Sequence, residues 1–292
     1  MRIIVGDIFE YRCLAYREGK KKPISPNQRT DFVKVKEDLG ESSISALEPH
    51  EIEDWLGFLQ THPKGIYKDG RDMTPYAEAT ARRFFYSLKK AVQWHQRKYR
   101  YYLRMDLFVL DEDQAPRAWE GHRERRLKVG EENALYAAGL TRRGSYTRED
   151  WEAVIGFALE TAMREQEITL ATFDDLENDG LDLKIPKENS KTETKRIIFL
   201  STKAREIIEA QRKTCPSGEN RIFHQFPSAN ALCEAFIDLR KRAKINDLRF
   251  HDLRHEATSR MCIKDEYKIS EIMQMTGHTS MKTFRGYVHI YE

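Results

Sequence analysis

The sequence FHDLRH at residues 250–255 is followed by Thr-Gly-His at residues 276–278 and, nine residues after His278, by Tyr287. Two histidines, an arginine and a tyrosine in this order match neither a metal site nor a hydrolase triad. They are the groups that a phenolic nucleophile would need to attack a phosphodiester. The Tyr287 hydroxyl must lose its proton as it attacks, and the imidazole of His251 is a suitable acceptor.

Two segments far upstream supply the remaining groups of such a site. The sequence AMREQE contains Arg164, and the sequence SKT contains Lys191. Planar, permanently charged guanidinium groups stabilise the non-bridging oxygens of a phosphate in transfer, so Arg164 and Arg254 are the candidates for this role. Lys191, at the tip of a predicted hairpin, can protonate the departing sugar oxygen. His278 can bond the phosphate or the nucleophile.

Basic residues are concentrated in one segment of the chain. The formal net charge of the 292 residues is only +3, so overall charge is a weak argument for a polyanionic partner. Residues 79–105 nevertheless contain no acidic residue, which favours a DNA-contacting helix over the alternative of a solvated helix face. The candidates for DNA contact are Arg82, Arg83, Lys89, Lys90, Arg97 and Lys98.

The cysteines and the apolar segments predict a soluble protein of the reducing cytosol. Cys13, Cys215, Cys233 and Cys262 are scattered without any C-x-x-C spacing, which argues against a zinc ribbon and a disulfide framework. The apolar start of the chain is soon interrupted, and no segment approaches membrane-spanning length. We therefore expect neither an export signal nor a membrane anchor.

Apolar periodicity in the first third of the chain predicts helices. Helical spacing runs over residues 30–59, with a break at Gly40 and a helix start predicted at the pair Glu48 and Pro49. A long helix is predicted from Pro75 to about Arg100. Residues 110–126 lose this periodicity and are densely charged, which predicts an interdomain linker and domains at residues 1–118 and 119–292. The predicted buried face of the long helix is Ala81, Phe84, Phe85, Leu88, Val92 and His95.

The second domain shows helical patterning with one small β signal. Helices are predicted over residues 130–138 and 148–163, and again from Thr202 to the end. Residues 181–185 and 196–200 are predicted to be the two strands of a hairpin. The fold class is therefore mainly α with a small β-hairpin or sheet, in two domains that close around DNA as a C-shaped clamp.

Each site residue also has a simpler interpretation when it is taken alone. Arg164 and Glu167 could form a surface ion pair, and Lys191 could be a solvated turn lysine. His251 and His255 could be one buried and one surface histidine, and Tyr287 could be a packing residue. The occurrence of all these groups together, in one order, favours an active site.

These residues resemble the tyrosine recombinase (phage integrase) family over residues 126–292, with weaker similarity in the N-terminal part. FHDLRHEA at residues 250–257 is especially similar to phage integrases and shufflon-type invertases. Glu167 matches an acidic residue that supports the site, and His289 matches the Y-x-H ending. The catalytic set that the resemblance implies is Arg164, Lys191, His251, Arg254, His278 and Tyr287.

The resemblance implies a transesterification that needs no metal, ATP or other cofactor. Tyr287 would form a 3′-phosphotyrosine link and free a 5′-hydroxyl, which a partner duplex exchanges. The implied partner is double-stranded DNA with inverted-repeat core sites, bound by a homotetramer that is a monomer or weak oligomer when free. A directionality or DNA-bending factor would be a further partner. The implied location is the cytoplasm of a prokaryote, at the nucleoid. The protein would be encoded by the prokaryote or by a phage or mobile element that integrates into its genome.

The two ends of the chain refine this expectation. The N-terminal unit resembles a helical core-binding domain and leaves no room for an arm-binding domain, so a simple recombination site is expected. Few residues follow Tyr287, which predicts either a truncated chain or a different route of communication between subunits. The alternatives are a type IB topoisomerase-like relaxing enzyme, a non-catalytic DNA-binding regulator and, with least support, a zinc hydrolase using His251 and His255.

Overall fold

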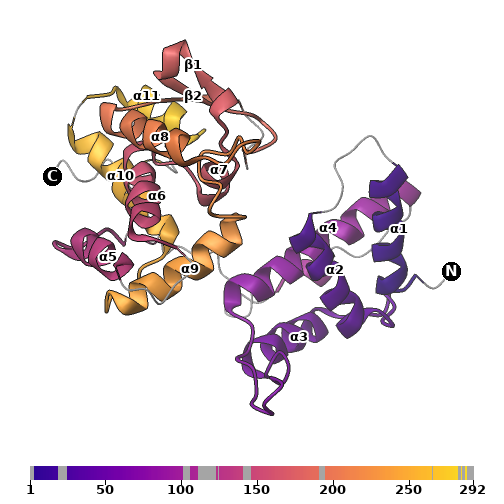
Figure 1. Cartoon of the computed structure of the whole chain (residues 1–292). Coiled ribbons are helices and arrows are strands. Elements are labelled where there is room, and N and C mark those ends of the chain that lie inside the picture. Colours follow the sequence, from indigo (N-terminus) through magenta and orange to yellow (C-terminus); the bar gives the residue numbers. More distant parts are fainter. Residues whose placement is uncertain are drawn as a thin grey trace. The chain divides into compact units, whose positions relative to one another are not determined.

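The computed structural model describes residues 3–18, 25–100, 106–110, 123, 125–140, 146–190, 195–264, 266–281, 284 and 287. The chain divides into two compact units, Met1–Gly121 and His122–Glu292. The boundary predicted between residues 118 and 119 lies outside the described residues. Each unit is described by itself, and Figure 1 shows the elements of both.

The first unit is built from helices. They are α1 (Val5–Glu18), α2 (Pro26–Leu39), α3 (Pro49–Thr61), α4 (Glu78–Tyr99) and a short 3-10 turn, η1 (Asp106–Phe108). A capping box starts α2, in which the Ser25 hydroxyl accepts the Gln28 N–H and the Gln28 side chain accepts the Ser25 N–H. The break predicted at Gly40 and the helix start predicted at Pro49 are both confirmed.

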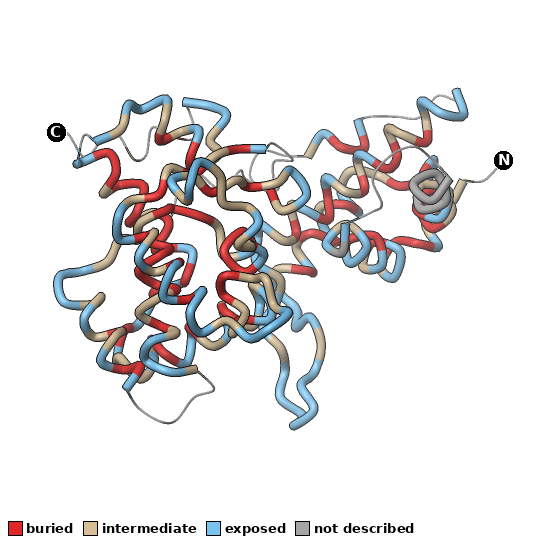
Figure 2. The backbone as a smooth tube through the Cα atoms, turned by 45° about the horizontal axis from the view of Figure 1, so that its top comes forward, coloured by how far each residue is buried: buried red, intermediate tan, exposed pale blue. Residues whose placement is uncertain are grey.

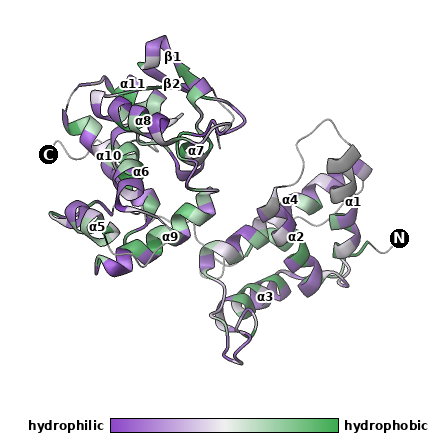
Figure 3. Ribbon diagram, in the orientation of Figure 1, coloured by the Kyte–Doolittle hydropathy of each residue, from purple (hydrophilic) through white to green (hydrophobic). Residues whose placement is uncertain are grey.

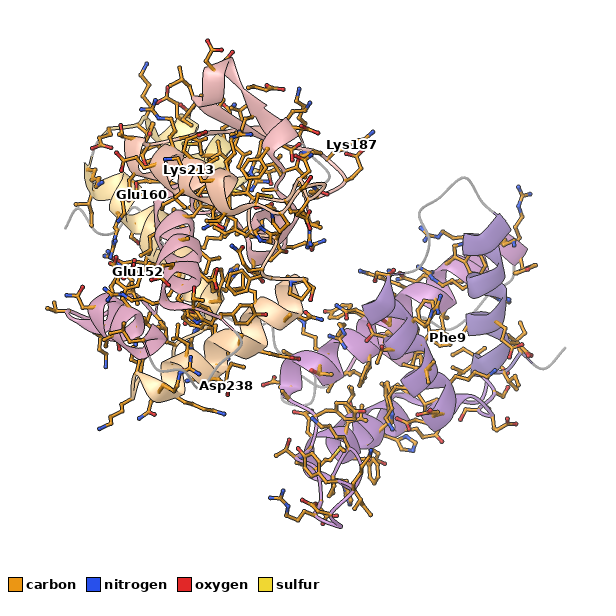
Figure 4. All side chains as sticks on the ribbon, in the orientation of Figure 1. Phe9, Glu152, Glu160, Lys187, Lys213 and Asp238 are labelled. Carbon is orange, nitrogen blue, oxygen red and sulfur yellow. The ribbon has the colours of Figure 1, made fainter. Side chains whose placement is uncertain are left out.

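The core of the first unit lies along one face of α4. The residues predicted for that face are all buried, and α1, α2 and α3 pack against the same helix. Phe9 of α1, labelled in Figure 4, meets Phe32 of α2 edge to face with ring centroids 4.7 Å apart. Figure 3 shows the alternation of apolar and polar residues along these helices. The periodicity did not predict α1, because Gly6 and Asp7 interrupt its apolar pattern.

The second unit combines helices with a small sheet. Its helices are α5 (Glu131–Gly139), α6 (Arg148–Thr161), α7 (Glu165–Leu170), α8 (Thr202–Thr214), α9 (Ala229–Arg242), α10 (Phe250–Lys264) and α11 (Ile269–Thr276). The antiparallel sheet has the order β1 (Leu176–Glu177), β2 (Asp182–Ile185) and β3 (Arg196–Phe199). The predicted hairpin is confirmed as β2 and β3, and the two-residue β1 extends it.

Helix α6 runs through the interior of the second unit. Trp151, Val154, Ile155 and Phe157 on this helix are at most 1% exposed, and both α8 and α10 pack against it. The tube in Figure 2 shows correspondingly long buried runs in this unit. The chain leaves α6 through Ala162, whose left-handed backbone (φ 52°) turns it directly into α7. This turn brings the segment with Arg164 close to α10.

Candidate active site

Arg164 stands at the start of α7 and is held by Glu167. The backbone N–H of Arg164 donates to one carboxylate oxygen of Glu167 at 2.8 Å, and its Nη1 donates to the other at 3.1 Å. The side chain of Glu167 is 1% exposed and that of Arg164 is 18% exposed. Glu167 is thus buried and Arg164 partly buried, so the ion pair considered from the sequence is present but does not lie on the surface.

A second arginine, Arg196 of β3, meets the same carboxylate. Its Nη2 donates to Glu167 Oε2 at 2.5 Å, and its Nε donates to the Met275 carbonyl of α11 at 2.9 Å. Burial raises the pKa of Glu167, but the hydrogen bond and charge of Arg196 outweigh this effect and the pKa is lowered. Glu167 is thus an anion between two cations. Arg196 was not predicted from the sequence, where its signal is an arginine at an inward strand position, in register with buried Ile198.

Arg254 of α10 connects two helix ends. Its Nη1 donates to the Ala162 carbonyl at 2.5 Å, and its Nη2 donates to the Thr276 carbonyl. Burial and the nearby charge of Arg164 lower its pKa, which Glu167 opposes. The side chain remains a cation at neutral pH. These bonds place it between the segment that carries Arg164 and the segment that carries His278.

The hydrogen bonds around Thr276 indicate which ring nitrogen of His278 carries a proton. The Thr276 hydroxyl donates to the Ile272 carbonyl at 2.6 Å and lies 2.7 Å from His278 Nδ1. A hydroxyl has one proton, so both hydrogen bonds are satisfied in the tautomer in which His278 Nδ1 carries a proton. Burial and the charge of Arg254 lower the pKa of His278 to about 4, so the neutral ring keeps its lone pair on Nε2.

Tyr287 lies among two imidazoles and a phenyl ring. Its hydroxyl is 2.8 Å from His255 Nδ1, and its ring centroid is 5.5 Å from that of His255. The rings of His278 and Phe284 lie 5.4 and 5.6 Å away. Burial raises the pKa of Tyr287, against the charges of Arg254 and Arg164, so the group is a phenol at neutral pH.

His251 has a different partner from the one its predicted role requires. Its Nδ1 is 3.3 Å from Glu165 Oε2, and its side chain is 45% exposed. Its ring meets the His255 ring edge to face at 5.3 Å. The hydrogen bond of the Tyr287 hydroxyl is thus to His255, which the sequence analysis had not assigned to the site. The available signal was its position one helical turn after His251, on the same face of α10.

Lys191 lies outside the described residues, and its role stays a prediction. Ser190 is the described residue directly before it. Ser190 is buried and its Oγ lies 3.5 Å from Arg196 Nη1. Lys187, labelled in Figure 4, pairs with Glu188 at 3.8 Å on the surface.

The six predicted DNA-contacting residues lie on α4, where several have partners within the unit. Arg83 pairs with the buried carboxylate of Asp31 at 2.8 Å, and Arg97 Nε donates to the Gln93 carbonyl at 3.2 Å. Arg82 lies over the Tyr86 ring. Aromatic rings also lie beneath Lys89 and Lys98. Lys90 lines a cavity of about 520 Å³ whose wall also includes Arg82 and Arg83.

Two negative findings hold for the described part of the chain. No group of three or more His, Cys, Asp or Glu side chains there is arranged to hold a metal ion. No helix in those same ranges is both long enough and apolar enough to cross a membrane.

Comparison with known proteins identifies the family. The model of the phage integrase family matches residues 125–292. The shufflon-specific DNA recombinase of Escherichia coli is 30% identical over 171 residues, which are 58% of this chain and 41% of that protein. The match therefore spans less than half of that relative's length.

Solved structures share the fold at low sequence identity. The Tn1549 transposon integrase in complex with circular intermediate DNA gives a TM-score of 0.72 at 13% identity, covering 98% of this chain and 95% of its own. The lambda integrase tetramer bound to a Holliday junction gives a TM-score of 0.72 at 15% identity, covering 98% and 77%. Since the family model also covers more than half of the sequence, this chain belongs to the phage integrase family.

Proposed function

We propose that this protein is a site-specific DNA recombinase that cuts and rejoins DNA through a 3′-phosphotyrosine intermediate, without a metal, ATP or another cofactor. One observation carries the proposal. The phenol of Tyr287 lies against His255 and His278 and is close enough to Arg254 and Arg164 for their charges to lower its pKa. The proposed nucleophile, the Tyr287 oxygen, thus lies beside two imidazoles and near two cations that would bind a phosphate.

In the proposed reaction, the Tyr287 oxygen forms a bond to phosphorus as the bond to the 5′-oxygen breaks. Arg164 and Arg254 stabilise the charge on the non-bridging oxygens, because guanidinium groups are planar and bidentate. Two of the five N–H groups of Arg254 are used by the Ala162 and Thr276 carbonyls, and others would bind the phosphate.

Two histidines are candidates for the acceptor of the phenolic proton. His251 is supported by Glu165, whose carboxylate stabilises the imidazolium that would form. His278 is supported by its unprotonated Nε2 and its closeness to the phenol. After protonation, His278 Nε2 can donate to the phosphate. Lys191 would protonate the departing 5′-oxygen.

The proposed partner is double-stranded DNA with inverted-repeat core sites, held between a core-binding and a catalytic domain in a C-shaped clamp. The basic helix α4 would contact phosphates through its six predicted residues. The lambda integrase relative is a tetramer on a Holliday junction, which supports a homotetramer on DNA here. We further propose a cytoplasmic, nucleoid-associated protein of a phage or mobile element, with its direction set by an accessory factor.

Trapping the covalent intermediate tests the proposal. The full chain is incubated with nicked suicide duplexes tiling the DNA that flanks the encoding gene, because integrases commonly act beside their own genes. We expect a protein–DNA adduct that resists denaturation, forms equally in chelator and is absent in Tyr287→Phe. An adduct at normal level in that variant would refute Tyr287 as the nucleophile.

Two other outcomes would favour the alternative functions. Relaxation of supercoiled DNA regardless of sequence, without strand exchange, would indicate a type IB topoisomerase-like enzyme. Specific binding to one flanking duplex without any adduct would indicate a DNA-binding regulator. Loss of the adduct in chelator alone would contradict the metal-free mechanism.

A further inference from the structure

His255 contacts the atom that reacts in the proposed mechanism. It follows Arg254 directly on α10, but its side chain takes a different direction. Arg254 donates to the Ala162 and Thr276 carbonyls, whereas His255 Nδ1 lies 2.8 Å from the Tyr287 hydroxyl. The two rings are nearly parallel, with an interplanar angle of 20°.

The contact fixes both the ring and the hydroxyl of the nucleophile. His278 and Phe284 also lie beside the phenol, but their ring contacts constrain only its plane. Among the described residues, His255 forms the hydrogen bond to the Tyr287 hydroxyl, since His251 Nδ1 is directed to Glu165. The direction in which the Tyr287 oxygen presents its lone pairs therefore depends on His255.

The electrostatic surroundings of His255 keep its imidazole neutral, so it can form a neutral hydrogen bond with the phenol. Burial and the neighbouring His251 lower the pKa of His255 to about 4, with Arg254 and Arg123 adding to the effect and Asp252 opposing it. The imidazole is neutral at pH 7 and can accept the phenolic O–H.

We infer that His255 is an additional active-site residue that positions the Tyr287 hydroxyl for attack, through its Nδ1 hydrogen bond and through stacking of the rings. This role rests on the proposed function, since it requires Tyr287 to be the nucleophile. A misplaced nucleophile reacts more slowly even when the substrate binds normally. Loss of His255 should thus slow cleavage without weakening DNA binding.

Two substitutions separate the hydrogen bond from the packing. His255→Phe keeps an aromatic ring beside Tyr287 but has no acceptor. His255→Asn loses the ring but keeps a hydrogen-bond acceptor, because the amide oxygen of asparagine and Nδ1 of histidine are the same number of bonds from Cβ. The full chain and both variants are compared on the suicide duplex that wild-type protein cleaves, by single-turnover adduct formation, gel-shift affinity and thermal unfolding.

We expect His255→Phe to cleave about 10- to 100-fold more slowly than wild type, with DNA affinity within about 2-fold. His255→Asn should recover most of the rate, to within about 5-fold of wild type. Cleavage by His255→Phe at the wild-type rate would overturn the inference. So would equal slowing of both variants accompanied by weaker DNA binding or a lowered unfolding temperature, which would indicate packing alone.

A failure of the proposed function gives a different result. If wild-type protein forms no adduct, or Tyr287→Phe forms one, the proposed function fails and the role of His255 fails with it. If wild type forms the adduct and Tyr287→Phe does not, the function stands, and only the two His255 variants decide this inference.

Discussion

Replacement of Glu167 by glutamine should strongly destabilise the second unit, His122–Glu292. The carboxylate accepts the Arg164 N–H at 2.8 Å, Arg164 Nη1 at 3.1 Å and Arg196 Nη2 at 2.5 Å. Glu167 and Arg196 are 1% and 5% exposed, so water cannot compensate for the lost charge. In Glu167→Gln, the NH2 group of the amide replaces one carboxylate oxygen. It then faces the N–H groups of a guanidinium, so two hydrogen-bond donors meet without an acceptor.

The expected loss in the free energy of unfolding is about 3 kcal/mol. Removal of one partner of a buried ion pair costs about 3–5 kcal/mol, because the other charge stays buried without compensation. The value should lie near the lower limit, since glutamine keeps one oxygen acceptor. Adding Arg196→Met to the variant should recover at least about 1 kcal/mol, because the stranded cation is then removed.

Urea unfolding of the full chain, followed by circular dichroism, measures these differences. Glu209→Gln is the matched control, because Glu209 pairs with Arg212 at 3.4 Å on the surface of α8, with side chains 60% and 46% exposed. The control should change the free energy by less than about 0.5 kcal/mol. A loss below about 1 kcal/mol in Glu167→Gln, or no recovery in the double variant, would refute the reasoning.

Three further predictions follow from single features. Gly277→Ala should cost about 1–2 kcal/mol in urea unfolding, because its φ is 71° and a Cβ would lie 3.4 Å from Arg196 Nε. Gly57→Ala, inside α3 with open space at its Cβ, should instead stabilise by about 0.5–1 kcal/mol, and equal effects would contradict the argument. Ser201→Ala should cost about 1 kcal/mol, because its hydroxyl caps α8 by accepting the Ala204 N–H at 3.2 Å; an unchanged urea midpoint would disprove the cap. Burial lowers the pKa values of His255 and His278 from 6.5 to about 4. As the pH falls, these two histidines therefore bind protons in the unfolded chain at a higher pH than in the folded chain. Stability present above pH 6.5 should therefore be lost as the pH falls toward 4, and a flat urea midpoint across this window would rule out that coupling.

Local signals predicted the longer elements of the fold. Helix α4 places its apolar residues at regular spacing, and Pro49 marks a helix start because its fixed φ suits the first turn and its missing N–H is not needed there. Gly40 follows α2 with a φ of −58°, and its carbonyl accepts the Gly6 N–H at 3.0 Å, so a tertiary contact also contributes to that helix end. Strand β1 was missed because two residues carry no periodicity, and its identity comes from pairing Leu176 with Leu183. Helix α1 was missed because tertiary packing overrides its weak local pattern.

The sequence predicted which residues would lie together but not which contacts they make. Arg164, Arg254, His278 and Tyr287 are brought together, and their chemical roles stay a prediction. His251 and His255, however, lie one turn apart on the same face of α10, and the residue that meets Tyr287 is decided by the packing of the chain after α11. Arg196 was missed for a similar reason, since its carboxylate partner comes from a helix 29 residues away in sequence.

The two carbonyls bound by Arg254 have a consequence for how this protein can evolve. Ala162 ends α6 and Thr276 ends α11, and both residues are 0% exposed, so a cation there satisfies the negative ends of two helices. Under the proposed function, a lineage that stopped cutting DNA would no longer need Tyr287 as a nucleophile, whereas loss of Arg254 would still leave two buried acceptors unpaired. Descendants that survive only as DNA-binding proteins should therefore keep this arginine long after the tyrosine has gone. The presence of this arginine in a relative would then indicate the shared fold and not recombinase activity.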